Sequence, residues 1–105
     1  MTARVQIPAK ARRGEVLTVR IAIQHPMETG FRSGTNGRII PRNIIERFTA
    51  TWNGRQIFDM TLSPAIAANP FISFFAVAQE SGRVVMRWTG DDGFQVEESV
   101  AIAVE

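Results

Sequence analysis

The sequence contains no cysteine and only one histidine, His25. The missing cysteine excludes disulfides, thiolate catalysis, iron–sulfur clusters and cysteine-based zinc sites. A blue-copper centre needs two histidines and a cysteine, so it is excluded as well. A catalytic zinc site needs about three protein ligands and has no support. His25 and Met27 remain as a weak pair of ligands for a soft metal, and we expect no cofactor.

Common catalytic motifs are also missing. No Gly-x-Ser-x-Gly nucleophile elbow occurs, and Gly34-Thr35-Asn36-Gly37 lacks the Lys-Ser/Thr of a phosphate-binding loop. The sequence therefore favours a protein that is not an enzyme by itself.

Charge and hydropathy argue against nucleic acid and membranes as partners. The net charge is +2, and the basic residues, eleven of them arginine, are spread along the chain with no run longer than Arg12-Arg13. Such a distribution does not favour nucleic-acid binding. No window approaches the roughly 20 apolar residues of a membrane span, and residues 1–13 lack the apolar core of a signal peptide. Taken alone the chain looks cytoplasmic, unless it is exported while bound to a partner that has the signal.

Alternating apolar residues predict an all-β fold. The clearest strand is 15–24, where Leu17, Val19, Ile21 and Ile23 point to one side. Asn53-Gly54 between two alternating runs predicts a type I′ hairpin. Further strands are expected at 4–7, which Pro8 ends, and at 44–52, 55–62, 71–78, 83–89 and 94–104. About seven antiparallel strands in one domain, residues 1–105, predict an immunoglobulin-like β-sandwich, with a small barrel as the alternative.

Two segments do not fit a simple strand. The connection from His25 to Arg38 is long and has no strand pattern, and such connections in compact domains tend to be functional. It is either a solvent-exposed crossover or a recognition loop. Residues 71–78 are apolar on both faces, so Phe71, Phe75 and Val77 need a second cover. That cover is either another part of this domain or another protein.

Several specific segments run through nearly the whole chain, from about Arg13 to Val104. They are His25-Pro26-Met27-Glu28-Thr29-Gly30, the stretch from Gly37 to Ile45, Asn53-Gly54, Ala68-Asn69-Pro70-Phe71 and Trp88-Thr89-Gly90-Asp91-Asp92-Gly93. In combination they resemble the SoxZ family, the Z subunits of the SoxYZ sulfur carrier in periplasmic thiosulfate oxidation. Gly90 is a departure, because the family pattern usually has an acidic residue there.

The resemblance implies a function that agrees with the missing cysteine. In that family SoxY carries sulfur intermediates on the cysteine of a C-terminal arm, and SoxZ is its sandwich partner. The resemblance therefore implies a non-catalytic subunit of a heterodimer, with transient contacts to other Sox enzymes and a periplasmic location reached by co-export with SoxY. Two alternatives stay open: a SoxZ-like module of a quinoprotein dehydrogenase system, and a stand-alone metal or ligand-binding sandwich that uses His25 and Met27.

The residues that we expect to contact a partner come from both unusual segments, with Arg42 and Asn69 added from the stretches beside them. The arginines offer bidentate donors to carboxylates or to a sulfonate, and the apolar residues offer a heterodimer surface. The expected residues are His25, Met27, Glu28, Thr29, Arg32, Arg38, Arg42, Asn69, Phe71, Phe75 and Val77.

Overall fold

The computed structural model describes residues 3–63 and 65–105. The strands are β1 (Ala3–Gln6), β2 (Lys10–Ala11), β3 (Val16–Ile23), β4 (Ile45–Trp52), β5 (Arg55–Thr61), β6 (Phe71–Val77), β7 (Gly82–Gly90) and β8 (Gln95–Val104). A short 3₁₀ turn, η1 (Asp91–Gly93), joins β7 to β8. No helix among the described residues is long and apolar enough to cross a membrane.

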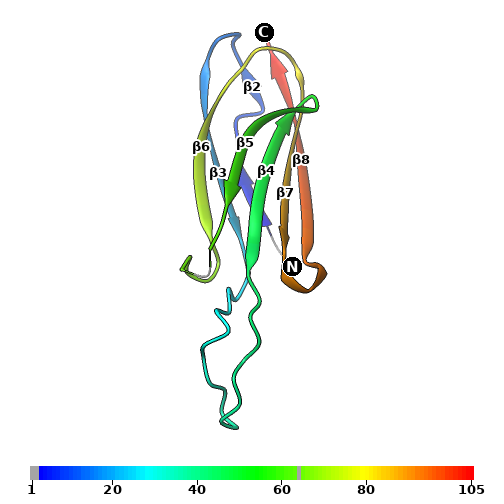
Figure 1. The fold of residues 1–105 in the computed structure, drawn as a ribbon. Helices are drawn as coiled ribbons and strands as arrows, with labels where there is room; N and C mark the ends of the chain where they lie inside the picture. The colour runs from blue at the N-terminus through cyan, green and yellow to red at the C-terminus, as the bar shows by residue number, and fades with distance from the viewer. Residues whose placement is uncertain (1–2, 64) are drawn as a thin grey trace.

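Two sheets pack face to face (Figure 1). One has three strands in the order β1-β3-β6, and the other has five in the order β2-β8-β7-β4-β5. This arrangement confirms the predicted immunoglobulin-like sandwich, and two separate sheets exclude the small barrel. Between β5 and β6, where two prolines leave room for one helical turn, the chain follows the segment 63–70, whose residue 64 lies outside the described residues. Its described residues from 65 onward form turns and bends.

The N-terminal segment corrects the all-antiparallel prediction. Pro8 ends β1, as predicted, because proline has no N–H for the ladder. The chain then crosses to the other sheet, where the two residues of β2 pair in parallel with Ala103 and Val104 of β8. The N–H groups of Ala103 and Glu105 donate to the carbonyls of Ala9 and Ala11. The segment 9–14, which has no strand pattern in the sequence, therefore contains a two-residue edge strand of the larger sheet.

The core lies between the two sheets, as the alternation predicted. The inward residues of β3 are buried, while their neighbours on the same strand are half-buried or exposed. Phe74 of β6 stacks on Phe58 of β5 from the opposite sheet, with ring centroids 4.4 Å apart and an interplanar angle of 10°. Phe48 lies 5.0 Å from Trp88. Phe74 also contacts Phe48 of the opposite sheet, with ring centroids 6.0 Å apart. The rings of Phe74 and its two partners therefore join the layers, whereas Phe48 and Trp88 pack within the five-stranded sheet.

The β4–β5 hairpin has the predicted turn. Asn53 and Gly54 have φ angles of 50° and 81°, which a type I′ turn requires at both central positions. The Asn53 side chain also crosses to the neighbouring turn, where its Oδ1 accepts the Arg83 N–H at 3.0 Å. Gly82 lies directly against this amide, so a Cβ there would be 1.8 Å from Oδ1.

Residues 25–44 form an arm that extends away from one end of the sandwich (Figure 1). The molecule measures 58 × 20 × 19 Å, and its radius of gyration is 16.1 Å. A compact domain of this length has a radius of about 13 Å. The predicted loop ended at Arg38, but the return side of the arm continues to Ile44, so residues 39–44 belong to neither sheet.

Candidate partner-binding surfaces

The outer side of β3 and β6 is a broad, partly apolar surface, which we call the β3–β6 face. Cross-strand pairs place Val16 opposite Val77, Thr18 opposite Phe75, and Ala22 opposite Phe71. Val16, Phe71, Phe75 and Val77 are 62%, 63%, 71% and 49% exposed. The alternate residues of β6 point into the core, so the domain's own core does not cover Phe71, Phe75 and Val77. Strand β6 is therefore apolar on both faces because one face packs in the core and the other is an exposed apolar surface.

The outer side of the five-stranded sheet has the opposite character. Arg47 pairs with Asp59 through two hydrogen bonds of 2.8 and 3.0 Å, and Arg87 pairs with Glu97. Threonines occupy the positions between them on β4. Such a surface is well solvated and does not need a cover. The two outer faces therefore differ clearly, and only the β3–β6 face has the composition of an interface core.

His25 lies at the base of the arm and is 3% exposed. Its backbone N–H donates to the Asn69 side-chain oxygen at 2.9 Å, and its carbonyl accepts the Asn69 N–H at 2.8 Å. Its Nδ1 accepts the Met27 N–H at 3.0 Å, which fixes the neutral ring in the Nε2–H form. The ring packs edge-on against Phe94 with centroids 4.7 Å apart. His25 and Asn69 therefore join the arm to the loop before β6.

The surroundings of the His25 ring favour its neutral form. Burial lowers the pKa of His25 from its usual 6.5, while the nearby Asn43 side chain and the charge of Asp91 act in the opposite direction. Nε2 of His25 and Oδ1 of Asn43 are nonetheless both buried without a hydrogen bond of good geometry. The Asn43 contact is therefore a weak one.

Met27 is also buried, with a φ angle of 52°. Its sulfur accepts the Ile45 N–H at 3.3 Å, which links the outgoing side of the arm to the start of β4. The side chains of His25 and Met27 therefore offer no surface to a partner, in contrast to the sequence-based expectation. Among the residues that the structure describes, no three His, Cys, Asp or Glu side chains come together as a metal site.

Arg42 closes the base of the arm from the return side. It makes a bidentate pair with Asp91 of η1, at 2.8 Å from Nε and 2.7 Å from Nη2, and Nη2 also donates to Glu46. Asp91 accepts the Ile44 N–H as well. The Arg42 guanidinium is the main reason why the pKa of Asp91 falls to about 2. Arg42 was expected to offer donors to a partner, but its Nε and Nη2 donors are already used within the chain.

The outer part of the arm is held only by backbone and surface contacts. Glu28 and Asn43 exchange two backbone hydrogen bonds of 2.8 and 2.9 Å. Glu28 also pairs with Arg32, whose guanidinium lowers the pKa of that carboxyl. Thr29 accepts the Phe31 N–H through its hydroxyl. Arg32, like Arg42, is therefore paired within the chain.

The tip of the arm is exposed and partly apolar. Phe31 is 88% exposed and Ile39 is 64% exposed. Gly34 and Gly37 close a turn with an N–H to carbonyl distance of 3.1 Å. Within the described residues, the Arg38 side chain makes no ion pair or hydrogen bond, so Arg38 is the one predicted arginine of the arm whose whole guanidinium is available to a partner.

The comparison with protein families decides the identity of this sandwich. The family model "Sulphur oxidation protein SoxZ" matches residues 5–101, which is nearly the whole chain. The chain belongs to the SoxZ family. It is therefore a subunit of the sulfur-oxidising Sox system, and membership of the SoxZ family implies association with a SoxY-like protein. No curated protein matches the chain.

Solved structures similar to this SoxZ-family chain share its fold. Superoxide reductase (neelaredoxin) from Ignicoccus hospitalis is 15% identical with a TM-score of 0.72, over 100% of this chain and 81% of that chain. The sulfur carrier protein SoxY from Chlorobium limicola f thiosulfatophilum is 12% identical with a TM-score of 0.68, over 98% of this chain and 78% of that chain. The CARDB domain of a Pyrococcus furiosus protein, solved with di-metal ions, is 11% identical with a TM-score of 0.58, over 99% of this chain and 93% of that chain.

Some surface residues of this SoxZ-family chain were missed from the sequence. Val16 lies on the β3–β6 face, and its signal was an apolar residue at a polar position of the alternating strand. Phe31 and Ile39 are also exposed. The signal that could have found them is their position beside a glycine-rich turn, where a buried side chain is not expected. Asp91 gave no local signal, because its partner Arg42 is far away in sequence.

Proposed function

We propose that this chain is the non-catalytic subunit of a SoxYZ-type sulfur carrier, and that it binds a SoxY-like protein through the β3–β6 face. The observation that carries the proposal is the cluster of four exposed apolar side chains on one face of a sheet, Val16, Phe71, Phe75 and Val77. The family membership of the chain supports a SoxY-like protein as the partner.

The chemistry of the chain supports a division of labour between two subunits. A covalent sulfur carrier needs a thiolate, because the thiolate is the nucleophile in cysteine chemistry. This chain has no cysteine, so it supports a carrier and does not itself hold the sulfur. The proposal includes a periplasmic location, reached together with the SoxY-like protein.

The physics of the exposed face supports a stable complex. Burial of apolar surface contributes about 25 cal/mol for each Å² removed from water, and an obligate interface resembles a domain core cut in half. Phe71 and Phe75 are large side chains on an ordered strand, so little conformational entropy is lost when a partner covers them. Strand β6 also lies at the edge of its sheet, where a partner has direct access.

The test is co-expression of the chain with a SoxY-like subunit, followed by gel filtration at micromolar concentration. We expect one peak that contains both chains in equal amounts. The variant Phe75→Ser should shift the two chains to separate monomer peaks while its circular dichroism and melting temperature stay close to those of the wild type. The control Val85→Ser changes a half-buried residue of β7 on the opposite sheet and should leave the complex intact.

Two results would count against the proposal. Separate monomer peaks for the wild-type chain would show that no stable heterodimer forms. A complex that tolerates Phe75→Ser but not Val85→Ser would place the interface on the five-stranded sheet.

A further inference from the structure

The three-stranded sheet has an unusual charge composition. Strands β1, β3 and β6 contain two arginines, Arg4 and Arg20, and no aspartate or glutamate. Within the described part of the chain, the five ion pairs all lie in the arm or on the five-stranded sheet. Neither Arg4 nor Arg20 takes part in any of them. The sheet thus has two guanidinium groups that form no ion pair with any carboxylate of residues 3–63 and 65–105.

Strand pairing places both arginines on the same side as the exposed apolar residues. Arg4 lies opposite Ala22, which in turn lies opposite Phe71. Arg20 lies between Gln6 of β1 and Ser73 of β6. The β3–β6 face and the adjacent part of β1 therefore have a cationic end near the arm and an apolar end at Val16 and Val77.

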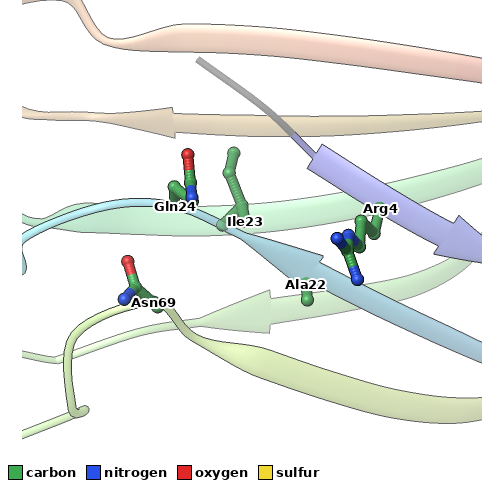
Figure 2. A pocket seen from close by; sticks show the side chains of 5 residues that line it. All are labelled: Arg4, Ala22, Ile23, Gln24 and Asn69. Atoms are coloured by element: carbon green, nitrogen blue, oxygen red, sulfur yellow. The ribbon is translucent and has the colours of Figure 1, made fainter.

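Hollows in the surface surround these guanidinium groups. One, of about 260 Å³, is lined by both arginines together with Gln6, Ile21, Ala22 and Phe71. A second, of about 500 Å³, is lined by Arg4, Ala22, Ile23, Gln24 and Asn69. Figure 2 shows the Arg4 side chain on β1 beside Ala22 of β3 in this second hollow. The first hollow, which has two guanidinium groups and the ring of Phe71 in its wall, suits a carboxylate whose aliphatic stem packs on the ring.

We infer that the SoxY-like subunit presents acidic side chains that pair with Arg4 and Arg20, while its apolar side chains cover Phe75, Val77 and Val16. This inference rests on the proposed function. If the face is covered, the two guanidinium groups leave water. A charge that is buried without a counter-charge strongly destabilises a complex, so the partner must supply anions at this end. The separation of charge from apolar surface then allows the partner to dock in one orientation only.

The experiment measures the dissociation constant between the chain and its SoxY-like subunit by isothermal titration at several salt concentrations. We expect Arg20→Glu and Arg4→Glu to weaken binding by about thirtyfold or more each, the usual effect of breaking one desolvated charge pair. The control Arg55→Glu makes the same change of net charge on β5, in the opposite sheet, and should change affinity less than about threefold at physiological salt, where surface charges are screened. A lysine scan of the partner's Asp and Glu residues should find a position that restores binding to Arg20→Glu.

The outcomes separate this inference from the proposed function. If Phe75→Ser abolishes binding while Arg4→Glu and Arg20→Glu bind as well as Arg55→Glu, the inference is wrong and the proposed function stands. If the wild-type chain binds no SoxY-like subunit, the proposed function itself fails. If free acetate perturbs Arg4 and Arg20 in NMR spectra while charge reversal leaves partner affinity unchanged, the hollows bind small anions, and the inference is again wrong.

Discussion

The single buried histidine allows a sharp test of how the arm is anchored. The substitution His25→Phe keeps an aromatic ring against Phe94 but removes Nδ1, the acceptor for the Met27 N–H at 3.0 Å. A buried donor left without a partner costs about 1–3 kcal/mol. A domain of this size has a total stability of about 5–15 kcal/mol, so the loss is readily measured at neutral pH.

The pH dependence gives the same substitution a second readout. Burial lowers the pKa of His25 in the folded chain below its usual 6.5, so the unfolded chain binds more protons as the pH falls below 6.5. The free energy of unfolding of the wild type should therefore be constant near pH 7 and fall as the pH decreases through 6.5 toward the folded pKa. His25→Phe lacks this group, so the difference in stability between wild type and variant should shrink from pH 7 to pH 5.

Urea unfolding at fixed pH, followed by the fluorescence of the two buried tryptophans, Trp52 and Trp88, measures both quantities. The chain has no other histidine and no cysteine, and the pKa of Asp91 is about 2. The change in the free energy of unfolding between pH 5 and 7 therefore comes mainly from the titration of His25. A wild-type stability that rises on acidification, or a difference that grows toward pH 5, would refute the assigned environment of the ring.

Three further substitutions test other parts of the structure. Phe74→Ala removes a buried ring stacked across the two sheets and should lower the free energy of unfolding by about 3–5 kcal/mol, whereas the exposed neighbour Phe75→Ala should change it by less than about 0.5 kcal/mol; chemical denaturation compares the two. Gly82→Ala forces a Cβ against the Asn53 amide and should cost about 1–3 kcal/mol through the lost turn hydrogen bonds, measured in the same way. Asp91→Asn breaks the bidentate arginine pair; because the pKa of Asp91 is about 2, its melting temperature should be below that of the wild type at pH 7, and the gap should narrow as the pH falls from 4 toward 2.

Local sequence patterns were sufficient for most of the sandwich. The alternation in β3 identified its buried side because each strand residue faces opposite to its neighbours. Asn53-Gly54 identified a turn because few residue pairs accept positive φ at both positions. Strand β2 was missed because two residues are too short to show any period. Its pairing depends on where the chain crosses after Pro8, which only the three-dimensional arrangement determines.

The environment of the arm depended on contacts between residues distant in sequence. His25 is buried because Asn69 and Phe94 close over it, and nothing near residue 25 indicates this. Arg42 is occupied because Asp91, in η1, lies beside it. The sequence left open what covers Phe71, Phe75 and Val77, since an apolar strand has two faces and its pattern alone does not show whether the domain or a partner packs on the second one.

The most direct measurement of the central claim is hydroxyl-radical footprinting of the chain, free and in complex with its SoxY-like subunit. We expect Phe71 and Phe75, which are exposed in the free chain, to be oxidised readily alone and strongly protected in the complex, while the buried Trp88 stays unreactive in both. Equal oxidation of Phe71 and Phe75 with and without the bound subunit would contradict the assignment of the β3–β6 face as the partner surface.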